Sequence, residues 1–235
     1  MSMPGMPAPA KRWKVIAYID GFNLYYGLKE SDWRRYLWLD LPALANSLIR
    51  SDQDLVKTKY FTSRVVSPEG KKKRQSIYLE ALTAHCGAKL GMYFGHYQSD
   101  PWKCNTCGAV ENVPSEKKTD VNIAVEIMMD AFDNAFDTAL IVTADSDLIP
   151  PILAVKRLYP HKRIFVAFPP KRHSVELERE ASVSFTIGRA KFAQAQMPEV
   201  VAKPDGTQLR RPAKWCAVQT EFGKTLGAAL GINED

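Results

Sequence analysis

The feature that most constrains this chain is a run of five apolar residues, Val15 to Ile19, that ends abruptly at Asp20-Gly21. A run with no polar position fits a strand buried on both faces, which is typical of parallel sheets covered by helices. Shorter apolar runs follow and alternate with segments of helical spacing. We expect strands near 13–19, 55–66, 90–96, 139–143, 163–168 and 183–187, and helices near 41–49, 75–86, 116–132 and 148–158.

This alternation predicts an α/β fold, a three-layer sandwich with a mostly parallel central sheet. Composition divides the chain of 235 residues into three parts. Residues 1–12, rich in Pro, Met and Ala, are expected to form a flexible tail. Residues 13–192 are expected to form the domain, with a turn-rich segment near 98–115. Residues 193–235 are interpreted as an appendage, with Trp215 docking on the domain and a weak helix at 221–230.

Charge and composition limit the classes of function. No apolar run reaches the ~18 residues that a membrane span needs, so no membrane association is expected. The N-terminus lacks the apolar core of a secretory signal, and the four cysteines are interpreted as thiols or metal ligands of a cytoplasmic protein. The net charge of +6 favours a nucleic acid as partner, although many basic proteins bind none.

Carboxylates follow two of the expected buried strands. Asp20 comes directly after the first strand, and Asp145 and Asp147 come after the strand at 139–143. In open α/β sheets, ligands bind beyond the carboxyl ends of the strands, so these positions are candidates for chemistry. Taken singly, each Asp is more often a helix cap or a turn former, and Asp147 suits the N-cap of the helix near 148–158.

Asp120 adds weight to the chemical interpretation. Its helix is expected to bury a face with Ala124, Ile127, Met128 and Ala131, and Asp120 lies on that face. Burying an unpaired charge is very costly, so Asp120 needs a partner: a metal ion shared with other carboxylates, or a Lys or Arg. A cluster of Asp without His suits Mg²⁺ or Mn²⁺. The opposite face is expected to be solvated and carries Asn122, Glu126, Asp130 and Asp133.

Three sequence blocks carry a family resemblance. They occur in family order and resemble the signature blocks of the NYN domain family, a branch of the PIN-like nucleases, with the LabA-like bacterial members most similar. The resemblance covers roughly residues 13–192. The blocks are Tyr18-Ile19-Asp20-Gly21-Phe22-Asn23-Leu24-Tyr25, Lys117-Lys118-Thr119-Asp120-Val121-Asn122 and Val142-Thr143-Ala144-Asp145-Ser146-Asp147-Leu148.

The resemblance implies a parallel sheet in which the first and fourth strands are neighbours. It implies an acidic site of Asp20, Asp120, Asp145 and Asp147 that binds Mg²⁺ or Mn²⁺ and hydrolyses phosphodiester bonds. Asn23 would orient Asp20 or a phosphate. The chain departs from the family pattern where Thr143-Ala144 replaces Ser-Gly and where Leu148 replaces an aromatic residue.

The substrate implied is RNA, single-stranded or structured, and the activity implied is that of an endoribonuclease. Expected substrate contacts, beside Asn23, are Thr143, Ser146, Lys118, Lys171 and Arg172. The main alternative is an RNA-binding or regulatory module with weak or no nuclease activity. An aspartyl phosphatase with Asp20 as nucleophile is disfavoured, because such enzymes need a second Asp where Phe22 stands. No P-loop, GxGxxG or GxSxG motif is present.

Other features carry two interpretations each. Cys104 and Cys107 form a single CxxC pair, as in similar loops of LabA-like relatives, and could hold a structural Zn²⁺ in a small hairpin; the alternative is a reduced thiol pair. A homodimer would bring four such sulfurs together. The basic run at 71–74 could contact RNA phosphates or simply be solvated. Trp33, Tyr36 and Trp38 could stack on bases, but core packing is favoured.

Overall fold

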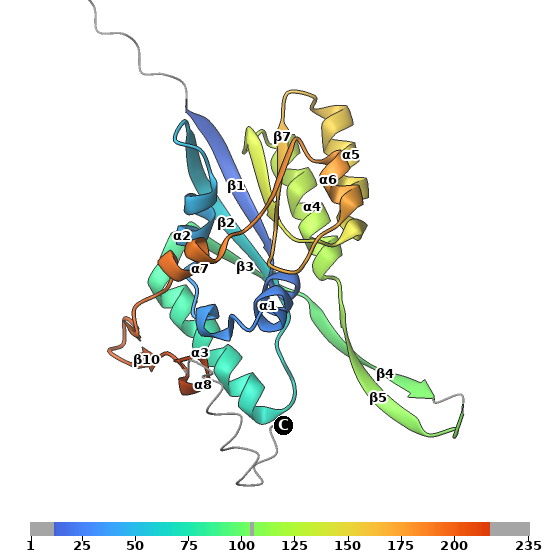
Figure 1. Cartoon of the computed structure of the whole chain (residues 1–235), viewed down its shortest axis with the longest axis vertical. Helices are drawn as coiled ribbons and strands as arrows, with labels where there is room; N and C mark the ends of the chain where they lie inside the picture. Colours follow the sequence, from blue (N-terminus) through green and yellow to red (C-terminus); the bar gives the residue numbers. More distant parts are fainter. Residues whose placement is uncertain (1–11, 104–105, 217–235) are drawn as a thin grey trace, which may run out of the picture.

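The computed structural model describes residues 12–103 and 106–216 of the chain. Its centre is a six-stranded sheet in the order β3-β2-β1-β6-β7-β8 (Figure 1). Every neighbouring pair of these strands is parallel. The strands are β1 (Trp13–Asp20), β2 (Gln53–Thr62), β3 (Leu90–Phe94), β6 (Thr138–Val142), β7 (Arg163–Phe168) and β8 (Val183–Thr186).

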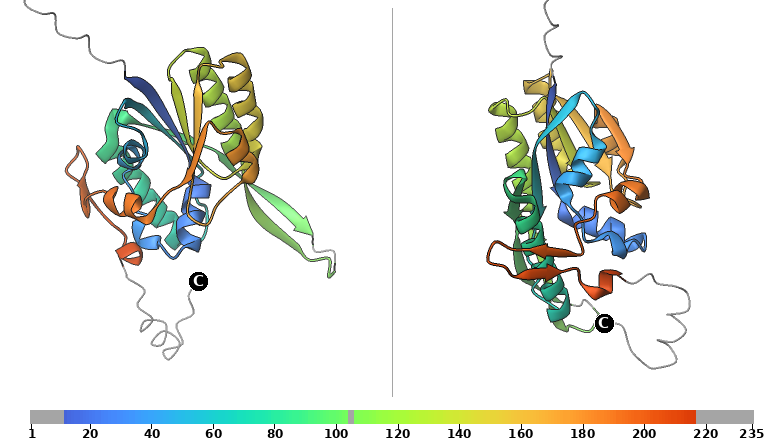
Figure 2. Two further views of the ribbon diagram at one scale, coloured as in Figure 1. Left: turned by 45° about the horizontal axis from the view of Figure 1, so that its top comes forward. Right: turned by 90° about the vertical axis from the view of Figure 1, so that its left-hand side faces the viewer.

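Helices cover both faces of the sheet (Figure 2), so the predicted three-layer α/β sandwich is confirmed. One layer contains α1 (Gly21–Glu30), α2 (Leu41–Leu48), α3 (Glu69–Cys86) and α7 (Arg189–Gln194). The other contains α4 (Thr119–Phe132), α5 (Ile149–Leu158) and α6 (Val175–Glu180). Alternate residues of β1 face the two layers: Val15, Ala17 and Ile19 pack with the first, and Ile16 and Tyr18 with the second.

Local signals set several helix ends where the sequence places them. Asp40 caps α2, accepting a hydrogen bond from the N–H of Ala43 at 2.8 Å. Gly87, with φ of 51°, ends α3 as a C-cap glycine. Two prolines occupy the first turn of α5, where a missing N–H costs little. The first and fourth expected strands, β1 and β6, are neighbours as the resemblance implies.

Three elements differ from the sequence expectation. Helix α1 begins directly after Asp20, where no helix is predicted. Helix α3 begins at Glu69 rather than near Gln75, so the basic run at 71–74 lies in its first two turns. Helix α4 begins at Thr119 rather than Glu116, because the preceding residues pair in an antiparallel hairpin of β4 (His96–Lys103) and β5 (Val110–Lys117). This hairpin projects from the sheet (Figure 1).

The solvated face predicted for α4 is wrong at two positions. Glu126 and Asp130 are both half-buried, and each carboxylate lies 2.6 Å from the Nζ of Lys59 on β2. The hydroxyl of Tyr18 also donates to Asp130 at 2.6 Å. Helical periodicity alone cannot show this, because the partner of both carboxylates comes from a strand far away in the sequence.

The chain after α7 returns to the first helical layer. It forms β9 (Val200–Ala202), β10 (Gln208–Arg210) and the short α8 (Ala213–Cys216). Trp215 is buried against Trp38 and Tyr78, with ring centroids 6.4 and 5.9 Å away. Trp38 is fully buried, which supports core packing for this aromatic group. The weak helix expected at 221–230 lies outside the described residues.

Within the described ranges, no helix is long and apolar enough to cross a bilayer.

Candidate metal centre and adjoining cleft

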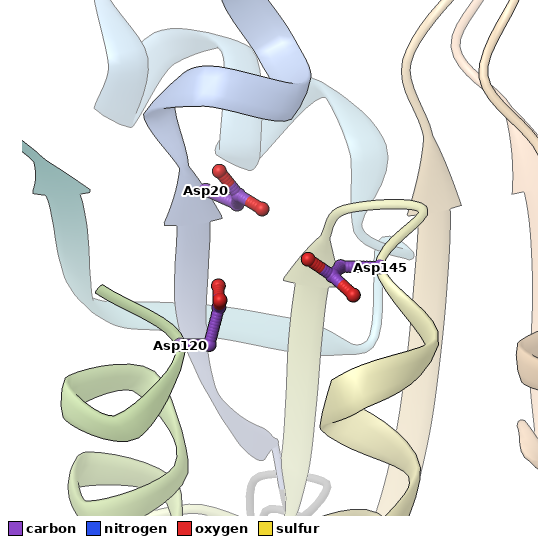
Figure 3. Close-up of side chains that lie close together, drawn as sticks. All are labelled: Asp20, Asp120 and Asp145. Carbon is purple, nitrogen blue, oxygen red and sulfur yellow. The ribbon is translucent and has the colours of Figure 1, made fainter. Parts of the chain in front are cut away.

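Three carboxylates meet at the carboxyl edge of the sheet (Figure 3). Asp20 ends β1, Asp145 follows β6, and Asp120 lies in the first turn of α4. Each offers an oxygen, and these oxygens all lie within 4.8 Å of one another. Since β1 and β6 pair directly, with Ile19 opposite Val142, the topology itself brings Asp20 and Asp145 together.

Asp20 is held by neutral hydrogen-bond donors. Its Oδ1 accepts from the N–H groups of Phe22 and Asn23 at 3.0 Å each, so it also caps α1. Its Oδ2 accepts from the Nδ2 of Asn23 at 2.6 Å and from the hydroxyl of Thr143 at 2.9 Å. Asp20 therefore caps α1 and contributes to the acidic cluster in one and the same conformation.

Burial raises the pKa of Asp20, because the residue is only 2 % exposed and its carboxyl loses water. The hydrogen bonds from Asn23 and Thr143 lower that pKa in part, and the charge of Asp145 raises it further. The ionised form of Asp20 is thus stabilised by dipoles but lies beside like charge. A cation between the carboxylates would remove this conflict.

Asp145 has a matching double role. Its N–H donates to the hydroxyl oxygen of Thr143 at 3.1 Å, and its Oδ1 accepts from the N–H of Asp147 at 3.0 Å. Asp145 therefore caps the short 3-10 helix η3 (Ser146–Leu148) that precedes α5. Asp147 does not cap α5 as predicted, because the N-cap of α5 is Leu148, which forms no side-chain capping hydrogen bond.

Asp147 and Ser146 follow Asp145 in the chain, and Asp147 does not join the group of three carboxylates. Both are exposed on η3, and Asp147 is not in the group whose oxygens approach within 4.8 Å. Its role as a metal ligand remains a prediction. Thr143, expected to contact substrate, is fully buried and instead orients Asp20.

The three basic residues expected beside the site are placed differently from one another. Lys118 is exposed immediately before α4, in a left-handed conformation with φ of 78°. Lys171 and Arg172, in the loop after β7, both bind Glu30 at the end of α1. The Nζ of Lys171 donates to the carbonyl of Glu30 at 2.8 Å. Their charge is thus used to fix this loop to α1.

The donor set suits a hard divalent cation. All three clustered ligands are carboxylates, one of them nearly fully buried, and Mg²⁺ and Mn²⁺ prefer such oxygen ligands. The zinc site predicted at Cys104 and Cys107 stays a prediction. Cys104 lies outside the described residues, and Cys107 is an exposed free thiol.

A cleft of about 400 Å³ opens between α1, α3 and α8. Gly21 and Phe22, directly after Asp20, are among its lining residues. This cleft does not follow from the sequence pattern, because α1, which supplies much of the lining, is not predicted there. Its basic and aromatic lining residues are Lys29, Arg34, Lys71, Arg74 and Lys214, with Phe22, Tyr25, Tyr26, Tyr60, Tyr78 and Trp215.

The parallel sandwich with an acidic centre at its carboxyl edge defines a class of α/β proteins suited to oxygen-ligated metal chemistry. The family model of the NYN domain matches residues 14–188. The chain therefore belongs to the NYN domain family, a nuclease-type family within the PIN-like superfamily.

Two further similarities accompany this assignment. A curated relative, 6-hydroxy-3-succinoylpyridine 3-monooxygenase HspA of Pseudomonas putida, is 25 % identical over 253 aligned residues, covering 92 % of this chain and 79 % of the relative. A crystal structure of a protein of unknown function from Vibrio parahaemolyticus matches with a TM-score of 0.51 and 16 % identity. That match covers 78 % of this chain and 98 % of the other, and it supports the fold alone.

Proposed function

We propose that this chain is a divalent-metal-dependent endoribonuclease. The observation that carries the proposal is the convergence of Asp20, Asp120 and Asp145, whose oxygens lie within 4.8 Å of one another at the carboxyl edge of the sheet. Family membership supports a nuclease, and the basic net charge of +6 suits a polyanionic substrate. The reaction adds water across a phosphodiester, breaks the bond to the 3′ oxygen, and leaves 5′-phosphate and 3′-hydroxyl ends.

Each residue has a defined part in this proposal. Asp20, Asp120 and Asp145 would hold Mg²⁺ or Mn²⁺, which when bound lowers the pKa of water and stabilises charge on the phosphate. Asn23 and Thr143 hold Asp20 in one orientation through Oδ2.

The exposed residues at the edges of the cluster would meet the substrate. Lys118 precedes Asp120, and Ser146 and Asp147 follow Asp145 on an exposed turn. We assign Lys118 and Ser146 to phosphate contacts and Asp147 to the outer edge of the metal site.

The direct test is cleavage of a linear and a circular RNA by the purified chain in Mg²⁺, in Mn²⁺ and in EDTA. Asp120→Asn should lower the rate by about a hundredfold or more, because a charged ligand is lost. Asp133→Asn is the matched control, since Asp133 is exposed at the far end of the same helix. Cleavage of the circle distinguishes endonuclease from exonuclease activity. Equal rates for the two variants would refute the proposal.

The alternative is an RNA-binding or regulatory module of the same fold. It predicts that the wild-type chain binds RNA but leaves it intact in both metals. Mn²⁺ titration followed by electron paramagnetic resonance separates the cases further. A nuclease centre should bind the ion and lose affinity on Asp145→Asn, whereas an inactive module with no metal requirement should show no such site.

The named relative suggests a second candidate, oxygenation of an aromatic acid. The cleft favours it, because about 400 Å³ lined by tyrosines and cations is the size and chemistry of a pocket for such a molecule. A monooxygenase also needs O₂, two electrons from a reductant and usually a cofactor. Consumption of NADH with 6-hydroxy-3-succinoylpyridine, with and without added flavin, tests this reading directly.

A further inference from the structure

The cleft between α1 and α3 has a chemistry of its own, distinct from the acidic cluster. We propose that it binds a short single-stranded segment of the RNA that flanks the cleaved bond, stacking unpaired bases on Tyr25 and Tyr26 while cations hold the phosphates. This inference rests on the proposed function for its substrate and narrows that substrate to single strands. The Asp cluster alone does not distinguish single-stranded from double-stranded RNA.

The charge of the cleft is the first argument. Five cationic side chains and no carboxylate line it. Within the part of the chain that the structure describes, no carboxylate forms an ion pair with any of these five. Lys171 and Arg172, by contrast, already bind Glu30. The cleft is therefore a concentration of uncompensated positive charge, which attracts a phosphate backbone. The five cations are Lys29, Arg34, Lys71, Arg74 and Lys214.

The exposed aromatic rings are the second argument. Tyr25 and Tyr26 are adjacent on α1, and they are 37 % and 40 % exposed. Their rings meet edge to face with centroids 5.3 Å apart, and the Nζ of Lys29 lies 5.5 Å from the ring of Tyr26. Exposed rings among cations are the usual platform for unpaired bases, because every base has a face that can stack. Bases inside a duplex are stacked on each other and offer no such face.

The wall shared with the acidic cluster is the third argument. Gly21 and Phe22 line the cleft, and the N–H of Phe22 donates to the Oδ1 of Asp20. Tyr60, another lining residue, packs so closely on Gly21 that a Cβ there would lie 2.9 Å from its ring. The start of α1 therefore belongs both to the lining of the cleft and to the hydrogen bonds that hold Asp20. A strand bound in the cleft would continue toward the cluster past this helix start.

The test compares two lysines on one helix. Lys71 lines the cleft, whereas Lys73, two residues further along α3, is exposed and does not. Binding of a fluorescein-labelled ten-nucleotide single strand is followed by anisotropy in EDTA, over a range of salt. Lys71→Gln should weaken binding at least threefold and reduce the salt slope by about 0.7, the share of one phosphate contact on a single strand. Lys73→Gln should change neither quantity by a comparable amount.

A second pair of measurements tests the stacking. Tyr26→Ala should weaken binding of the single strand about tenfold, in keeping with the loss of one base–ring stack. A duplex of the same length should bind the wild-type chain more weakly than the single strand and should respond little to Tyr26→Ala. Equal responses of Lys71→Gln and Lys73→Gln, or tighter binding of the duplex, would overturn the proposal. If AMP displaced the labelled oligonucleotide with an affinity equal to that of the oligonucleotide itself, the proposal would also be overturned. That result would favour a pocket for a small molecule.

Because these measurements exclude metal, they fail independently of the proposed function. If the chain binds single strands through Lys71 and Tyr26 but never cleaves RNA, the proposal for the cleft stands and the nuclease proposal fails. If the Lys71→Gln and Tyr26→Ala variants cleave and bind RNA as the wild-type chain does, the nuclease proposal stands and the proposal for the cleft fails.

Discussion

The hydroxyl of Thr143 donates a hydrogen bond to the Oδ2 of Asp20 at 2.9 Å, joining the carboxyl ends of two neighbouring strands. The same hydroxyl oxygen accepts the N–H of Asp145 at 3.1 Å. One fully buried side chain therefore sets the relative positions of two of the three clustered carboxylates. The hydroxyl of Thr143 is the group on which this link depends.

Thr143→Val should weaken the centre without removing a ligand. Valine has nearly the same shape but cannot donate to Asp20, so Mn²⁺ affinity and RNA cleavage should each fall by about ten- to a hundredfold. Thr143→Ser restores the hydroxyl and should recover most of both. Mn²⁺ titration and cleavage rates check the effect, and thermal unfolding shows whether the variant folds. A Val variant with wild-type metal affinity would contradict the positioning role.

Asp145→Asn should stabilise the protein when metal is absent. Burial, and then the charge of Asp145, raises the pKa of Asp20. A carboxyl whose pKa is raised by folding contributes stability below its unfolded pKa and loses that contribution as the pH rises through the folded value. Above the folded-state pKa of Asp20, the ionised carboxylates therefore oppose folding. Removing one charge should raise the free energy of unfolding by about 1 kcal/mol in EDTA.

Denaturant unfolding with and without Mg²⁺ measures this effect. In saturating Mg²⁺ the wild-type chain should become more stable than Asp145→Asn, because the ion stabilises the wild-type cluster more than that of the variant. Asp133→Asn serves as the control for loss of a carboxylate on an exposed surface. A wild-type chain more stable than Asp145→Asn in EDTA would show that the three carboxylates are not in conflict.

The strand pattern and the acidic residues could be predicted from the sequence because both depend on local signals. The apolar run from Val15 to Ile19 requires burial on both faces, and the structure buries it so. Asp20 and Asp145 follow strands whose adjacency the family resemblance implies, and β1 does pair with β6. Asp120, which the helical pattern places on a buried face, is only half-buried, and its carboxylate lies with those of Asp20 and Asp145.

The cleft and the partners of α4 could not be predicted in the same way. Tyr25 and Tyr26 line the cleft only because α1 forms, and the segment after Asp20 carries no strong helix signal beyond its cap. Helical periodicity assigns Glu126 and Asp130 to solvent, but packing of α4 on the sheet places Lys59 beside both carboxylates. Non-local pairing of this kind leaves no trace in periodicity, so the sequence pattern assigns such residues to solvent.

Gly27→Ala should destabilise the protein although it lies within a helix. A Cβ at Gly27 would lie 2.8 Å from the Cβ of Pro169 and 2.9 Å from the carbonyl oxygen of Pro170, neither of which can turn aside. The gain in helix propensity, about 1 kcal/mol, is outweighed by an overpacking cost of about 2–3 kcal/mol. Gly188→Ala is the control, because nothing lies within 4 Å of its added Cβ. Thermal unfolding should show a lower Tm for Gly27→Ala and an unchanged Tm for Gly188→Ala.

Lys59→Met should be among the more destabilising changes to the side chains of the sheet. The Nζ of Lys59 lies 2.6 Å from both Glu126 and Asp130, and the side chains of all three are at most 21 % exposed. Burial alone would lower the pKa of Lys59, but the hydrogen bonds that its ammonium donates to Asp130 and Glu126 outweigh burial and raise that pKa. Removing the cation leaves two half-buried carboxylates without a neutralising charge, and this should cost about 2–4 kcal/mol.

The triple variant Lys59→Met, Glu126→Gln, Asp130→Asn separates the loss of the ion pairs from the loss of packing. It removes the lysine without leaving charge behind, so it should recover most of the lost stability, since a buried ion pair often gives little net stabilisation over neutral residues. Tyr18 keeps a hydrogen-bond acceptor in the new amide at residue 130, because its hydroxyl donates to that side chain. If the triple variant were no more stable than Lys59→Met, the defect would lie in the packing of the lysine stem beneath α4.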